Sequence, residues 1–209
     1  MHAPPRPGHP KLDGAHFPAL LDDLDAALRE LAAPFERDDA GWARAAPGRW
    51  SAGQHVEHIG HVLAIGATAL ESAADQLFRG DLGKRPWRDP IQALFVRAVT
   101  RKFPRGASSP RAALPQAAPD RARAFALLAQ GSLRHRALGE RLTVEQRDRL
   151  WIWNPYAPAL RWHYTFAEEV RVQTTHARHH AQSAAQAAAG DSTATADAHA
   201  AGRTPRPVD

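Results

Sequence analysis

The sequence contains no cysteine, and this excludes several kinds of chemistry at once. Disulfide scaffolds, thiolate zinc sites, iron–sulfur clusters and cysteine nucleophiles all need a residue that the chain lacks. Any metal ion would have to be bound by nitrogen and oxygen atoms. The 12 histidines make such a site possible.

The sequence also has no apolar run near the roughly 20 residues that a membrane-spanning helix needs. Residues 1–10 are rich in proline and histidine rather than apolar, so we expect no secretory signal there. These two absences predict a cytoplasmic protein with no membrane partner. The 209 residues, 44% of them hydrophobic and 23% charged, have the length and composition of one sizeable globular domain.

Lysine is scarce as well, because only 3 of the 27 basic residues are lysine and the rest are arginine. The formal net charge is +5, and residues 79–111 hold nine basic residues against two acidic ones, with Trp87, Phe95 and Phe103 between them. Such a segment could bind nucleic acid, or its arginines could bind an anionic thiol or substrate. The interpretation that we favour is a solvated crossover whose aromatic rings pack on the rest of the protein.

Hydrophobic periodicity predicts four amphipathic helices and no strand. They are expected over residues 16–35, 51–78, 119–142 and 160–189, with a short helix over 90–100 inside the long connection. Residues 1–12 and 190–209 are expected to be disordered tails. The domain of residues 13–189 is therefore predicted to be all-α, a four-helix bundle with one long crossover connection.

The last predicted helix carries the strongest sign of chemistry. His176 and His180 are four residues apart, so their side chains share one helix face, with Cβ atoms about 5–6 Å apart. From there two imidazoles can reach one ion at about 2.0–2.1 Å. Glu169 and Gln173 extend this polar line, which borders the apolar Val170. The pattern is typical of a ligand-lined interior, and a solvated face is the alternative.

A third ligand would have to come from another helix, and residues 51–78 contain His55, His58 and His61. On a helical wheel centred on Ile59, His61 points away from the apolar face. His55 points inward and His58 lies at the edge of that face. Periodicity therefore leaves His55 and His58 as alternatives.

Residues 50–59, Trp-Ser-Ala-Gly-Gln-His-Val-Glu-His-Ile, together with the later His-x3-His pair, resemble the DinB/YfiT-like superfamily, which is unrelated to the polymerase called DinB. The family pattern is a Trp-Ser helix start, a histidine eight residues after the tryptophan, and His-x3-His on the last bundle helix. The Asn-Pro turn at 154–158 is similar to the family's turn before that helix. One departure is Ser183, where family members often carry glutamine.

The resemblance implies one divalent ion, zinc or nickel, bound by His58, His176 and His180 with water at the open positions. It also implies a metal-dependent enzyme that acts on a small molecule, either a thiol S-transferase using a low-molecular-weight thiol as cosubstrate or a hydrolase. Many relatives look like homodimers. The alternative is a non-catalytic bundle that binds metal for stability, or one that binds nucleic acid through residues 79–111.

Four further residues are candidates for roles at such a site. Glu169 and Gln173 could orient a ligand imidazole or contact the substrate, and are the candidates for catalytic residues. Arg161 and Trp162 lie at the predicted start of the last helix and could line the mouth of a substrate pocket. For each of them ordinary packing or solvation is the alternative. His179 is expected to point away from the metal.

Overall fold

The computed structural model describes residues 16–36, 39–104 and 109–190, and this part of the chain is mostly helical. The tail predicted over 1–12, and that over 190–209 apart from Gly190, lie outside the described residues. The long helices are α1 (Phe17–Ala32), α3 (Ala52–Arg79), α5 (Arg121–Arg141) and α7 (Phe166–Ala189). The shorter elements are α2 (Asp39–Ala43), α4 (Pro90–Val99), α6 (Val144–Arg149), the 3₁₀ turns η2 (Ala33–Phe35), η3 (Arg111–Ala113) and η4 (Pro158–Leu160), and the strands β1 (Trp151–Trp153) and β2 (His163–Thr165).

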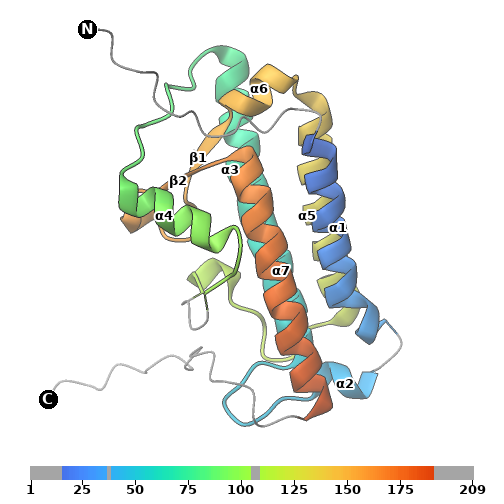
Figure 1. Ribbon diagram of the computed structural model, residues 1–209. Helices are drawn as coiled ribbons and strands as arrows, with labels where there is room; N and C mark the ends of the chain where they lie inside the picture. Colours follow the sequence, from blue (N-terminus) through green and yellow to red (C-terminus); the bar gives the residue numbers. More distant parts are fainter. Residues whose placement is uncertain (1–15, 37–38, 105–108, 191–209) are drawn as a thin grey trace, which may run out of the picture.

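The four long helices run side by side and enclose the apolar core (Figure 1). α3 packs against both α5 and α7, and α1 packs against α7 and α5. Two glycines let α3 and α5 approach closely. A Cβ added to Gly60 would lie 2.6 Å from the Cβ of Leu127, and one added to Gly131 would lie 2.5 Å from the Cβ of Leu63. Any larger residue at either position would push the two helices apart.

Capping boxes fix where the two site-bearing helices begin. The Ser51 side chain accepts from the backbone N–H of Gln54, whose side chain accepts from the backbone N–H of Ser51, as the sequence predicted for α3. Thr165 and Glu168 form the same box at the start of α7. The last helix therefore begins at Phe166, and the predicted start near residue 160 was wrong.

The expectation that the chain contains no strand was also wrong in one place. β1 and β2 pair antiparallel, with Ile152 opposite Tyr164. Each strand has only three residues, too few for an alternating pattern to be visible in the sequence. The two paired strands bring the ends of the intervening loop together. There the backbone N–H of Asn154 donates to the Trp162 carbonyl at 2.7 Å.

The connection between α3 and α5 contains the short helix expected over 90–100, observed as α4. α4 lies beside α7, on the side away from α1 (Figure 1). Thr175 of α7 donates to the carbonyl of Val99 at 2.8 Å, and Arg88 forms an ion pair with Glu168 at 2.7 Å. The connection is thus held against α7. None of the helices in the described ranges is long and apolar enough to cross a membrane.

Candidate metal centre and its pocket

Three buried histidines from two helices converge on one point. His58 comes from α3, and His176 and His180 come from α7. One ring nitrogen of each lies within 4.8 Å of the others, and the Nε2 atoms of His176 and His180 are 3.0 Å apart. Nitrogen atoms about 2.0–2.1 Å from a tetrahedral zinc ion are about 3.3 Å from one another. The three imidazoles could therefore hold a divalent ion after small side-chain rotations.

The orientation of His58 is fixed by the backbone of the connection. Its Nδ1 lies 2.7 Å from the carbonyl oxygen of Ala113, in η3. A carbonyl oxygen can only accept, so Nδ1 carries the proton and the lone pair stays on Nε2. A hydrogen bond of this kind, from the distal ring nitrogen to a carbonyl, is the usual support of a metal-binding histidine.

His55 supports His180 from the same helix as His58. The Nδ1 atoms of His55 and His180 are 2.7 Å apart, so one of them donates to the other. When Nε2 of His180 binds a cation, its proton resides on Nδ1, and His55 is the acceptor. Both histidines that the helical wheel left open thus face the cluster, whereas His61 is partly exposed beside Glu57.

Two aromatic rings cover the histidines. The Trp50 ring lies 4.9 Å from that of His58 and 6.1 Å from that of His180, between ring centroids. Phe103, from the connection, stacks on His176 at 3.8 Å with only 14° between the ring planes. These rings exclude water from the sides of the imidazoles and limit how far they can rotate.

The buried environment keeps His180 neutral. Burial, and then the nearby imidazoles of His176 and His58, lower the pKa of His180 well below its usual value near 6.5. A neutral imidazole is the form that binds a metal ion, so near pH 7 no proton has to be removed from His180 before a cation binds.

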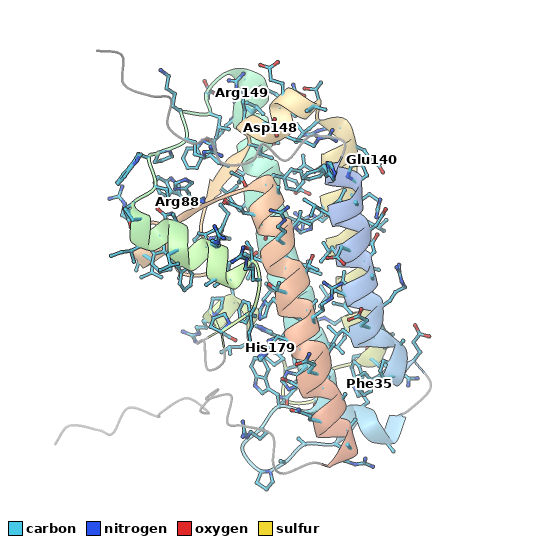
Figure 2. All side chains as sticks on the ribbon, viewed as in Figure 1. Phe35, Arg88, Glu140, Asp148, Arg149 and His179 are labelled. Atoms are coloured by element: carbon cyan, nitrogen blue, oxygen red, sulfur yellow. The ribbon has the colours of Figure 1, made fainter. Side chains whose placement is uncertain are left out.

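A pocket of about 290 Å³ opens beside the three histidines, which form part of its lining. Its walls come from α3, α4, α7, β2, the loop between β1 and β2, and the chain that follows α4. His179 also lines it, and Figure 2 shows this side chain on the flank of α7 away from α1, below the C-terminal end of α4. The cluster is therefore accessible to a small molecule.

Gln173 and Glu169 belong to a second polar cluster, one and two turns before His176 on α7, respectively. Glu169 accepts from the Tyr156 hydroxyl at 2.7 Å and from the Gln173 amide at 2.7 Å, and lies 3.4 Å from Nε2 of His135, on α5. Its hydrogen bonds thus orient this cluster, whereas Gln173 and Tyr156 also line the pocket. Burial, and then the charge of Glu169, raise the pKa of Tyr156 well above 10, so its hydroxyl stays protonated.

The two pocket-mouth candidates have different positions. Trp162 lines the pocket, where its ring lies 4.2 Å from that of Phe95. Arg161 does not belong to the lining, and its guanidinium lies over Trp153 at 6.0 Å. Neither residue is at the start of α7, because the chain from 158 to 165 forms η4 and β2 first.

Sequence reasoning missed His135, which is completely buried and pairs with Glu169. The only available signal was a histidine one turn after Gly131 on a predicted helix, and that spacing predicts no partner.

No protein-family model, curated protein or solved structure matches the chain.

Proposed function

We propose that this chain is a metal-dependent enzyme of the DinB/YfiT-like kind, a four-helix bundle in which His58, His176 and His180 bind one zinc or nickel ion. The observation that carries the proposal is the convergence of three buried histidines beside a pocket open to a small molecule. Three protein ligands with an open position are typical of catalytic metal sites, whereas structural sites are usually closed by four.

A divalent ion in such a site can lower the pKa of a bound water towards about 7 or bind a thiol as thiolate. The protein's own residues would keep the metal-binding imidazoles in place. Ala113 and His55 hold the rings of His58 and His180, while Trp50 and Phe103 exclude water around them. Because the chain has no cysteine, a thiol reaction would take its sulfur from a low-molecular-weight cosubstrate. The two reactions that we propose are S-transfer from such a thiol and hydrolysis of a small molecule.

The test compares zinc- or nickel-loaded protein with the chelated protein and with the His58→Ala variant. Each is assayed for conjugation of thiols to aromatic electrophiles and for ester and amide hydrolysis. We expect at least one reaction to require the loaded wild-type protein. Equal rates for all three samples would argue against an enzyme. A marked loss of thermal stability on chelation would then favour the alternative, a non-catalytic bundle that binds metal for stability.

Replacing His55 with alanine should weaken metal binding by about 10- to 100-fold, the usual cost of losing a residue that supports a metal-binding histidine. His180 would lose the acceptor for its Nδ1 proton. Chelator competition measures the affinity. His55→Gln, whose side-chain oxygen can still accept, should retain more of the affinity, and His61→Ala should leave it unchanged. Equal affinities of His55→Ala and wild type would show that His55 serves only packing.

A further inference from the structure

We infer that the ligand of this pocket is an uncharged, largely apolar small molecule with a single metal-binding head group. The inference rests on the proposed function for the position of that head, which would lie against His58, His176 and His180. The rest of the ligand is defined by the other walls of the pocket, whose chemistry can be tested with or without a metal ion.

The walls beyond the histidines are mainly aliphatic and aromatic. Val62, Val99 and Val172 contribute aliphatic surface from three different helices, and Phe95 and Trp162 contribute ring surface. Burying one methylene group of a ligand against such walls strengthens binding by about fourfold. A hydrocarbon or aryl body therefore gains affinity here until it fills the 290 Å³.

No Asp, Glu, Lys or Arg side chain lines the pocket among the residues that the structure describes. Glu169, the carboxylate of the polar cluster, is already engaged by His135, Tyr156 and Gln173. Arg88, a partly buried cation of the basic segment, pairs with Glu168 and donates to the His163 carbonyl. A charged ligand body would lose water without gaining a partner, which disfavours it.

Two further polar residues of the lining, Tyr156 and Asn154, hydrogen-bond within the protein, whereas the Oε1 atom of Gln173 is buried without a hydrogen-bond partner among the described residues. Tyr156 donates to Glu169 and accepts from Gln173, and Asn154 accepts from the backbone N–H groups of Tyr156 and Ala157. At the rim, Leu160 is 49% exposed and presents a further apolar surface to an entering molecule. None of the arginines of residues 79–111 that the structure describes lines the pocket, so these walls give no support to binding of an anionic thiol by them.

The experiment uses the full-length protein and two rigid thiols, benzyl mercaptan and its para-carboxylate derivative. In cobalt-loaded protein the thiolate-to-cobalt charge-transfer band reports binding, and we expect benzyl mercaptan to bind at least about tenfold more tightly. In alkanethiols, each added methylene should strengthen binding by about fourfold until the pocket is filled. Equal or tighter binding of the carboxylate would overturn the inference.

The same pair is titrated into metal-free protein, where quenching of tryptophan fluorescence reports occupancy and Trp162→Phe removes the reporter within the pocket. A preference for the neutral thiol here, with no charge-transfer band in the cobalt sample, would reject the proposed metal site and keep the inference for the body of the ligand. A charge-transfer band that forms equally with both thiols would keep the proposed metal site and reject the inference. No quenching and no band would overturn both.

A matched pair of variants tests whether the preference for the neutral thiol arises in the pocket. Leu160→Lys places a cation at the rim and should reduce the preference for the neutral thiol by about fivefold. Leu114→Lys is the control, because Leu114 is equally exposed, at 49%, but lies outside the lining. The same change in both variants would show that net charge, and not the pocket, sets the preference.

Discussion

Replacing His58 with alanine should abolish stoichiometric metal binding, with an affinity loss of more than about 100-fold. This exceeds the 10- to 100-fold cost of removing a supporting residue, because a ligand itself is lost. His58 is the one member of the cluster on α3, so its loss leaves only the two donors of α7. Metal content by mass spectrometry and chelator competition measure the change.

His61→Ala is the matched control for this variant. His61 lies on α3 one turn after His58, beside Glu57, with a side chain that is partly exposed. It should keep one ion per chain. Thermal unfolding of the metal-free samples completes the test, since a catalytic site predicts that His58→Ala stays folded. One ion per chain in His58→Ala, bound as tightly as in the wild type, would contradict the proposed ligand set.

Replacing Glu169 with alanine should lower the free energy of unfolding by about 3–5 kcal/mol, because it leaves His135 without its partner in the core. Both side chains are completely buried, and the Nδ1 proton of His135 is already donated to the Gly131 carbonyl at 2.8 Å. A proton on Nε2 is therefore needed for His135 to meet the carboxylate. Urea unfolding measures the loss. Asp75→Ala, which removes an exposed pair with Arg141, should cost less than about 1 kcal/mol.

The same pair predicts a pH window of stability. Burial alone would lower the pKa of His135, but the hydrogen bond and charge of Glu169 outweigh it and raise that pKa above 6.5. Its contribution is complete below pH 6.5 and is lost as the pH rises through the raised pKa. Burial would raise the pKa of Glu169, but His135, Tyr156 and Gln173 lower it below 4.5, so its contribution is lost as the pH falls through that lowered pKa.

The contribution of this pair to the free energy of unfolding is thus greatest between about pH 4.5 and 6.5. Glu169→Gln keeps the shape and removes the charge, so it should flatten this part of the pH profile. An unchanged profile in Glu169→Gln would show that the pair is not charged in the folded protein.

The sequence was informative where the site depends on local spacing. The line of Glu169, Gln173, His176 and His180 was expected to face inward on one helix, and all four are buried on α7. Periodicity could not choose between His55 and His58, and the structure shows why: both lie on the inward side of α3 and both contact the cluster.

The rest of the site depends on contacts between segments far apart in the chain. The carbonyl that orients His58 belongs to Ala113, 55 residues later, and the ring that stacks on His176 belongs to Phe103. No pattern of residues in the sequence predicts a hydrogen bond to a backbone carbonyl of a distant segment. The partnership of His135 with Glu169 is hidden for the same reason, since it exists only once α5 and α7 are packed together.

The contacts of Ala113 and Phe103 couple the packing of the connection between α3 and α5 to binding of the proposed cation. Since one residue orients His58 and the other covers His176, packing of this segment and uptake of the proposed ion would be linked equilibria. Linkage is reciprocal, so each event strengthens the other by the same free energy. The affinity for the proposed ion would therefore be adjustable from outside the long helices, by any change that strengthens or weakens the contacts of this segment.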